Sequence, residues 1–212
     1  MRPQGAHRLG TRLFVCALTL GLGVGLGCAP PVPPGTYPGE LLNPKSVAQD
    51  YVIRQHIEGT YGDRNVAFDA VVQKQGDVLL VLTLTPYGSR AFLVEQTGLD
   101  VRVEKFIPRD LPFDPSFILL DVQRTFMMGL PDGPLEDGWH KARMDDEIVR
   151  ERWLGGKLFE RRYARRDRKP KGAVVVTYEG GYVPGERPPN ITLTNEWFGY
   201  TLTLQTSDFQ RL

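Results

Sequence analysis

The sequence VLLVLTLT, at residues 78–85, is apolar on both of the faces that a β-strand presents. Successive side chains of a strand point to opposite faces, so a strand of this kind lies inside a sheet that is covered on both sides. Residues 86–89, Pro-Tyr-Gly-Ser, follow as a turn signal, and residues 90–96 return as the next strand. This stretch therefore predicts the centre of an antiparallel sheet.

Further strands are expected on both sides of this centre. Tyr51–Thr60 and Val66–Lys74 flank a turn at residues 61–65 and predict a hairpin, and Leu99–Ile107 extends the meander. About nine strands are expected in one domain, with no internal repeat and no second domain boundary. The later strands are Ile148–Leu154, Lys157–Ala164, Ala173–Glu179, Asn190–Trp197 and Tyr200–Thr206.

One strong helix signal interrupts the strands, between Asp114 and Gly129. Asp114 suits the N-cap, Pro115 suits the first helical position, and Gly129 is available near the C-cap. A shorter helix is expected to run from Asn43 toward Asp50. A helix as apolar as the longer one needs a large apolar surface, which the sheet would offer. Its apolar stripe contains Phe117, Ile118, Leu119, Leu120, Val122 and Phe126.

The N-terminal residues predict export and lipidation. Three arginines precede the apolar run Leu13–Leu26, which is too short and too glycine-rich for a comfortable transmembrane helix. Gly-Leu-Gly-Cys at residues 25–28 is typical of a lipoprotein signal, in which Cys28 receives a lipid and becomes the mature N-terminus. The alternative is an ordinary secretory signal with an incidental cysteine. We expect a signal peptide at residues 1–27, a tether at residues 28–42 and a folded domain at residues 43–212.

The expected mature chain differs from the precursor in composition. Removal of the signal leaves about 185 of the 212 residues and moves the formal charge from +1 to about −2. Cys28 is then the remaining cysteine, so an intramolecular disulfide is excluded, and the charge gives no indication of nucleic-acid binding. Ala29–Leu42 contains five prolines and is expected to be a solvated tether that reaches up to about 40 Å.

The residue types needed for common catalytic and metal sites are scarce. The mature chain has two histidines, His56 and His140, 84 positions apart, and no GxSxG motif. A zinc site of histidine and cysteine ligands and a cysteine–histidine nucleophile are both unsupported. Asp145, Asp146 and Glu147 could bind a metal, but a solvated turn is the favoured interpretation. We therefore expect no enzymatic activity, no cofactor and no metal.

Three other features each allow two interpretations. Asp121 could be a general acid in a cleft, or a hydrogen-bonded residue that faces solvent or a loop and pairs with Arg124, which is favoured. Residues 160–171 contain seven Lys or Arg and could lie against anionic headgroups, or could keep a long hairpin tip soluble and protect it from edge pairing. Tyr87 could contact a partner or membrane, or fold back on its own sheet.

The order of these features resembles the LolB family of outer-membrane lipoproteins, which receive lipoproteins from the periplasmic carrier LolA. A group of uncharacterised small bacterial lipoproteins has a similar layout. The resemblance spans roughly Tyr51 to Thr206, and its main motifs are the Pro-X-Gly-Ser turn and a Leu-Asp-X-Gln sequence in the helix. The residues that carry it are Val66–Ala70 with Val72, Leu82–Arg90 and Leu119–Gln123.

The resemblance implies a mainly β fold, in which a curved antiparallel sheet forms an incomplete barrel and the inserted helix covers its concave face. It also implies that acyl chains bind on this face. In LolB-like proteins a leucine of the Pro-X-Gly turn projects toward the membrane, and Tyr87 occupies that position here, which departs from the pattern. From strand parity and the helix stripe, the acyl-binding residues are expected to be Leu80, Leu82, Phe92, Val94, Ile118, Val122, Phe126, Leu202 and Leu204.

We therefore expect a monomeric envelope lipoprotein, anchored through Cys28 in the outer membrane and facing the periplasm. Ala29 lacks the aspartate that retains enteric lipoproteins at the inner membrane, which favours the outer membrane. The protein would bind lipidated cargo or lipid, with a LolA-like carrier as a possible donor. The alternative is a tethered interaction module whose barrel is filled by its own side chains. A hydrolase has no nucleophile motif to support it.

Overall fold

The computed structural model describes residues 37–108, 116–131 and 133–212. The expected signal peptide, the lipid site at Cys28 and the expected helix-start residues Asp114 and Pro115 lie outside these ranges. The described residues form one eleven-stranded sheet with every neighbouring pair antiparallel. Strand order is β5-β4-β3-β2-β1-β11-β10-β9-β8-β7-β6.

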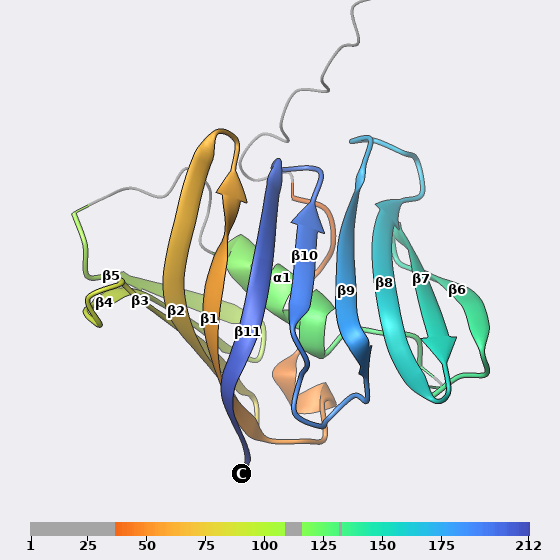
Figure 1. The fold of residues 1–212 in the computed structure, drawn as a ribbon, viewed down its shortest axis with the longest axis horizontal. Coiled ribbons are helices and arrows are strands. Elements are labelled where there is room, and N and C mark those ends of the chain that lie inside the picture. The colour runs from red at the N-terminus through yellow and green to blue at the C-terminus, as the bar shows by residue number, and fades with distance from the viewer. Residues whose placement is uncertain (1–36, 109–115, 132) are drawn as a thin grey trace, which may run out of the picture.

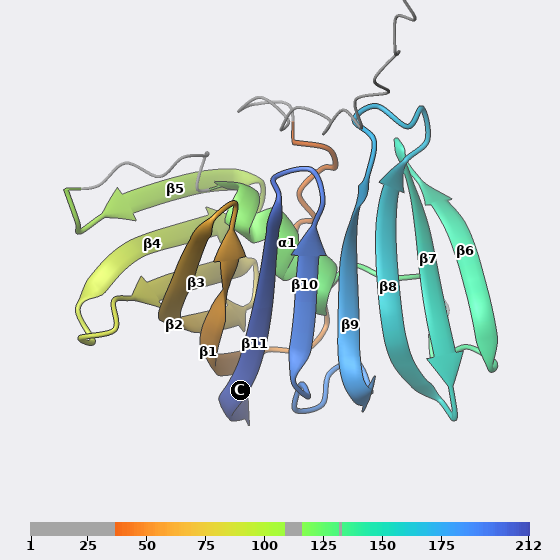
Figure 2. The ribbon, with the colours of Figure 1, turned by 45° about the horizontal axis from the view of Figure 1, so that its top comes forward.

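The sheet joins two meanders through its first and last strands, β1 and β11. It curves strongly, and its edge strands β5 and β6 do not pair with each other, so the barrel is incomplete (Figures 1 and 2). The expected fold class is confirmed. The strands are β1 Tyr51–Tyr61, β2 Arg64–Gln75, β3 Val78–Leu84, β4 Arg90–Thr97, β5 Asp100–Lys105, β6 Gly138–Met144, β7 Glu147–Leu154, β8 Lys157–Arg165, β9 Ala173–Tyr182, β10 Ile191–Asn195 and β11 Tyr200–Arg211.

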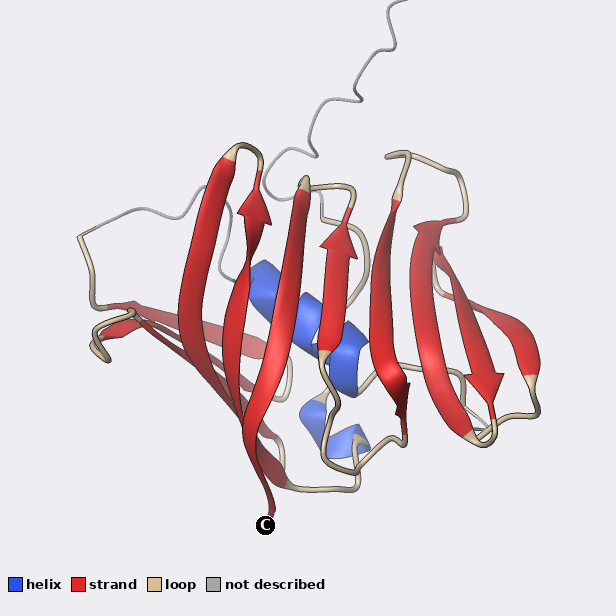
Figure 3. Ribbon diagram, viewed as in Figure 1, coloured by secondary structure: helices blue, strands red, loops and turns tan. Residues whose placement is uncertain are grey.

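The helix α1, Ser116–Phe126, lies in the hollow of the sheet (Figure 3). It ends three residues before Gly129. Just after its last residue, the amides of Met127 and Met128 both donate to the carbonyl oxygen of Gln123. Gly129 is needed for space rather than as a C-cap. A Cβ atom on Gly129 would lie 2.4 Å from Nη2 of Arg161, so a larger residue would collide with a buried side chain.

Ten of the eleven strands correspond to the ranges expected from the sequence, and β6 was not predicted. Its sequence, GWHKARM, is largely exposed and gives no apolar alternation. The helix expected from Asn43 toward Asp50 is a single 3-10 turn, η1, at Pro44–Ser46. The Asn43 side chain accepts a hydrogen bond from the Lys45 amide, so the expected cap is present although the helix is short.

Strand β3 lies inside the sheet but third from its β5 edge rather than at the centre, and the side chains that it turns toward the core are the opposite set to the one expected. Leu79 and Val81 are buried in the core, whereas Leu80 and Leu82 are half-buried on the other face, which contradicts their placement on the concave surface. Val81 stands opposite Val94, which is also buried in the core. Because both faces of β3 are apolar, its own sequence could not decide between the two registers.

Candidate functional site

The side of α1 that faces the interior is unexpectedly polar. Four polar residues of the helix are buried together with its apolar residues Leu119, Leu120 and Phe126. The polar four are Asp121, Gln123, Arg124 and Thr125. A polar group can be buried at low free-energy cost only if it finds hydrogen-bond partners there. The interior around α1 is therefore organised by a hydrogen-bonded network.

The first partner of this network is the segment Tyr37–Leu42, here called the N-terminal strap. The Tyr37 hydroxyl donates to Oδ1 of Asp121, and its ring packs on Phe117 and Phe198 with centroid distances of 4.9 and 4.8 Å. The Leu42 amide donates to Oε1 of Gln123 at 2.8 Å. The expectation of a solvated tether is wrong for much of this segment, because Tyr37 and Pro38 are buried and Leu42 is bonded to α1, whereas Glu40 is exposed.

Arg124 lies at the centre of the network. Its guanidinium donates to Oε1 of Glu147 at 2.8 Å and to the carbonyl oxygen of Pro38. Aromatic rings surround it, with the guanidinium carbon 4.9 Å from the Tyr37 ring centroid and 5.3 Å from that of Tyr163. One buried cation thus joins the helix, the strap and strand β7.

Asp121 is the buried acid of the network. Its second carboxylate oxygen accepts from the hydroxyl of Tyr200 and lies 3.5 Å from Nδ2 of Asn195. Nη1 of Arg124 lies 3.7 Å from Oδ1, so the expected pair within the helix is present, but it faces the interior rather than solvent or a loop. Burial raises the pKa of Asp121 to about 6, although Arg124 and Tyr37 act to lower it.

This raised pKa predicts stabilisation in mild acid. The folded chain keeps a proton on Asp121 where the unfolded chain has lost it, so the free energy of unfolding should rise by about 1 kcal/mol between pH 7 and pH 5. Asp121→Asn should lose this contribution. Hydrogen bonds to Asp69 and Glu58 raise the pKa of His56, and burial raises the pKa of Glu147. Each of these shifts also increases the free energy of unfolding as the pH falls.

The test is therefore a difference between variants. Urea unfolding at pH 7 and pH 5 is compared for the parent, Asp121→Asn and His56→Gln, in which the exposed histidine is removed as a control. An unchanged pH dependence in Asp121→Asn would show that the carboxyl is not protonated in the folded chain near pH 6.

A second buried ion pair, Arg161 with Glu151, lies between strands β8 and β7 on the side of the sheet that faces α1. Nε of Arg161 donates to Oε1 of Glu151 at 2.7 Å, and the Trp153 indole donates to the other carboxylate oxygen at 2.8 Å. Nη1 of Arg161 donates to the carbonyl oxygen of Arg124 at 3.0 Å. The concave side of the sheet is thus filled by the protein's own side chains beneath the helix.

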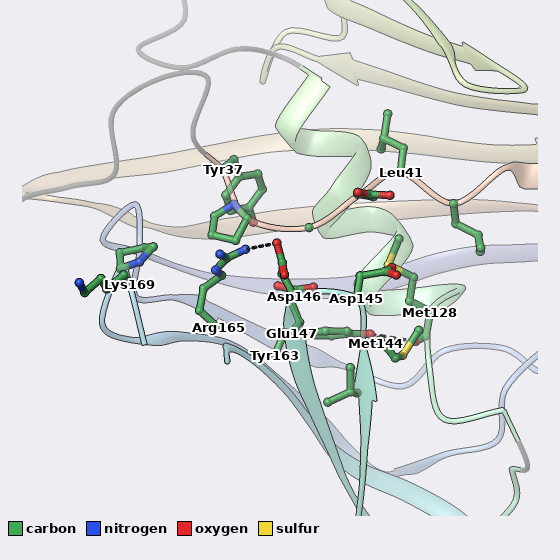
Figure 4. Close-up of a pocket in the computed structure, with 16 residues that line it drawn as sticks. Tyr37, Leu41, Met128, Met144, Asp145, Asp146, Glu147, Tyr163, Arg165 and Lys169 are labelled. Atoms are coloured by element: carbon green, nitrogen blue, oxygen red, sulfur yellow. Dashed lines mark hydrogen bonds and ion pairs between the residues drawn. The ribbon is translucent and has the colours of Figure 1, made fainter. Parts of the chain in front are cut away.

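An open cleft lies beside this filled interior, between the strap, the end of α1, the β6–β7 turn and the β8–β9 loop (Figure 4). Its volume is about 810 Å³, within the range of small-molecule binding pockets. Apolar lining residues are Leu41, Leu42, Met128, Met144 and Val149, and charged ones are Glu40, Asp145, Asp146, Glu147, Arg165 and Lys169.

None of the nine residues expected to bind acyl chains is among those that line this cleft. Val94, Phe126 and Leu204 belong to the buried core, and Ile118, Val122 and Leu202 pack against it half-buried. Phe92 is buried on the same side of β4 as Val94. The sequence signal that could have indicated the cleft is methionine, a flexible residue common at adaptable binding surfaces, since two of the chain's four methionines line it.

The other residues that the sequence indicated as candidate site residues lie in separate parts of the structure. Tyr87 is 94% exposed in the β3–β4 turn, so it does not fold back on its own sheet. His56 pairs with Asp69 across strands β1 and β2, while His140 contacts the carbonyl oxygen of Glu136. Within the described ranges, no group of three or more His, Cys, Asp or Glu side chains is arranged to hold a metal ion.

The acidic run at the β6–β7 turn is more than the solvated turn that was expected. Asp146 pairs with Arg165 at 3.2 Å, and Glu147 is buried against Arg124. Asp145 adopts a positive φ of 48° at the turn. Only part of this run is solvated, because Glu147 contributes its carboxylate to the buried network.

These observations define an open antiparallel half-barrel wrapped around one helix, with an amphipathic cleft at one end. The chain belongs to the family described as "Protein of unknown function (DUF3261)", whose model matches residues 52–208. A comparison with curated proteins finds no match. Among the described residues, no helix is both long and apolar enough to cross a membrane.

Two solved structures have a similar chain layout. One is a LolA superfamily protein from Nitrosomonas europaea, with 13% identity over 76% of this chain and 86% of that one, and a TM-score of 0.41. The other is a putative outer membrane lipoprotein-sorting protein domain from Vibrio parahaemolyticus, with 10% identity over 77% of this chain and 85% of that one, and a TM-score of 0.41.

Proposed function

We propose that this chain is a cell-envelope lipoprotein that binds an acyl chain, from a lipid or a lipidated protein, in the cleft beside the N-terminal strap. It would be anchored in the outer membrane through lipid on Cys28, face the periplasm, and act without catalysis. A LolA-like carrier is the proposed donor of lipidated cargo. The observation that carries the proposal is a cleft of about 810 Å³ with an apolar lining and a charged rim.

Capture in this cleft would be driven by the hydrophobic effect. Each methylene removed from water contributes about 0.8 kcal/mol, so several methylenes of an acyl chain would give a useful affinity. Met128 and Met144 are unbranched and adaptable, which suits a flexible chain without a fixed shape. An acyl lipid has one apolar part and one polar part. The apolar chain would lie against the lining of the cleft, and the polar end would stay in water at the charged rim.

The proposed site differs from the concave face that the resemblance implied. Beneath α1, the buried pairs Arg124–Glu147 and Arg161–Glu151 fill the interior. This filling favours one alternative, an interaction module that carries no ligand. Acyl-lipid binding requires a ligand in the cleft, whereas the interaction module would carry none.

The deciding experiment analyses lipid that co-purifies with residues 29–212, a form that retains every described contact because these begin at Tyr37. Mass spectrometry should find acyl lipid in this protein after purification without detergent, and Met144→Asp should lower the bound amount at least tenfold by placing a charge in the apolar lining. Leu154→Asp is the control, since Leu154 is 52% exposed in the β7–β8 turn region.

The outcomes separate the two functions. Protein that is repeatedly free of lipid would favour the interaction module. Equal lipid content in the parent and Met144→Asp would place any bound lipid outside this cleft. Melting temperatures of both variants establish that lost lipid does not reflect lost folding.

A further inference from the structure

The β8–β9 loop, residues 166–172, lies at the end of the molecule where the strap and the β6–β7 turn also lie (Figures 2 and 4). Lys169 and Pro170 of this loop line the cleft together with Tyr37 and Pro38 of the strap. The loop is therefore part of the cleft rim, next to the point where the described chain begins.

The structure divides the seven basic residues of the segment 160–171 into two groups. Arg161 is buried against Glu151, Arg162 lies 3.8 Å from Glu196, and Arg165 pairs with Asp146 and Asp167. The other four are exposed and, among the residues that the structure describes, form no ion pair with a carboxylate. These four, here called the loop cations, are Arg166, Arg168, Lys169 and Lys171.

Protection of a sheet edge does not explain the loop cations. Exposed charges are common where a strand edge must be kept from pairing with another molecule. Here β8 pairs with β7 and β9, and β9 pairs with β8 and β10, so neither strand is an edge. Of the two roles in that alternative, edge protection is therefore wrong, and solubility of the hairpin tip stays a prediction.

The charged residues of the cleft rim have both signs, and Asp146 lies on the same side as Arg165, paired with it at 3.2 Å. Figure 4 shows Lys169 and Arg165 at one side of the cleft, with Asp145, Met128 and Met144 at the other. The acid nearest in sequence to the loop cations, Asp167, is already engaged by Arg165 at 3.3 Å. The loop thus presents positive charge to the outside, beside the apolar lining.

We propose that the loop cations bind the surface of an anionic lipid bilayer and so hold the cleft mouth against the headgroups. The proposal rests on the proposed anchor at Cys28, since the nine residues from Cys28 to Tyr37 can span no more than about 30 Å. That short reach keeps the strap end of the domain near the membrane. The β3–β4 turn, which carries Tyr87, lies at the opposite side of the molecule (Figures 1 and 2).

The test measures sedimentation of residues 29–212 with vesicles of phosphatidylcholine alone or mixed with phosphatidylglycerol. Each basic residue near an anionic surface increases binding about fivefold, so Arg166→Gln with Arg168→Gln should weaken binding to the anionic vesicles about 25-fold. The control removes the same charge elsewhere, by Lys45→Gln with Lys157→Gln, in η1 and the first residue of β8, at the other end in Figure 1. It should bind within about threefold of the parent.

Two results would overturn the proposal: equal binding by the loop variant and the parent, or equal binding of the parent to neutral and anionic vesicles. A loss of binding in Tyr87→Ser that exceeds the loss in the loop variant would assign the contact to the β3–β4 turn instead. Co-purifying acyl lipid is measured in the same samples. Vesicle binding without cleft lipid would reject the proposed function alone, and cleft lipid without vesicle binding would reject the loop proposal alone.

Discussion

Replacement of Arg124 by methionine should lower the free energy of unfolding by about 3–5 kcal/mol. The Arg124 side chain is fully buried, and its loss leaves the buried Glu147 carboxylate without its cation. The carbonyl oxygen of Pro38 loses its donor as well. Methionine preserves much of the side-chain volume, so the effect reports lost charge pairing and hydrogen bonding more than lost packing. Urea unfolding at pH 7 is the measurement.

A matched pair of variants makes this prediction specific. Arg166→Met removes an exposed arginine of the β8–β9 loop and should change stability by less than about 0.5 kcal/mol. Glu147→Gln combined with Arg124→Met should recover part of the loss, because the uncompensated charge is then absent. Equal, small effects of Arg124→Met and Arg166→Met would contradict the central place of Arg124 in the network.

Replacement of Tyr37 by alanine should cost about 3–5 kcal/mol of stability and release the strap. The ring of Tyr37 contacts Phe117, Phe198 and Trp197, and its hydroxyl lies between Asp121 and Asn195. Release of the strap would also remove one wall of the cleft, so co-purifying lipid should fall together with stability.

Tyr37→Phe separates the ring from the hydroxyl. It keeps the aromatic contacts and should cost only about 1–3 kcal/mol, the usual effect of leaving a buried acceptor unsatisfied. Urea unfolding gives the stability, and limited proteolysis within residues 38–42 reports whether the strap is bound. A Tyr37→Ala protein as stable and as resistant to proteolysis as the parent would show that the strap is not part of the folded unit.

The sequence predicted most of the sheet because turns and alternation are local signals. The hairpin of β1 and β2 and the meander up to β5 lie where their turn residues indicate. Strand β6 was missed because its residues are mostly exposed, and the parity of β3 was wrong because both of its faces are apolar. That parity is set by contact with Val72 and Val94, which belong to other strands.

The site was less predictable because its parts come from distant segments. A proline-rich composition indicated solvated chain, but the strap is fixed by side chains such as Asp121 and Gln123, more than 80 positions away. The helix was expected to bury an apolar stripe. Only part of that stripe is fully buried, and Asp121 and Arg124 are buried with it. Their partners Glu147, Asn195 and Tyr200 lie on three other strands, so no local pattern contains the network.

The most direct measurement of the central claim is photo-crosslinking with a diazirine-bearing fatty acid, followed by peptide mapping of residues 29–212. Labelled peptides should contain Leu41 or Leu42 of the strap, Met128 and Met144, and excess unlabelled fatty acid should suppress the labelling. Saturable labelling confined to peptides of the sheet outside the cleft, or none that unlabelled fatty acid suppresses, would contradict acyl-chain binding in this cleft.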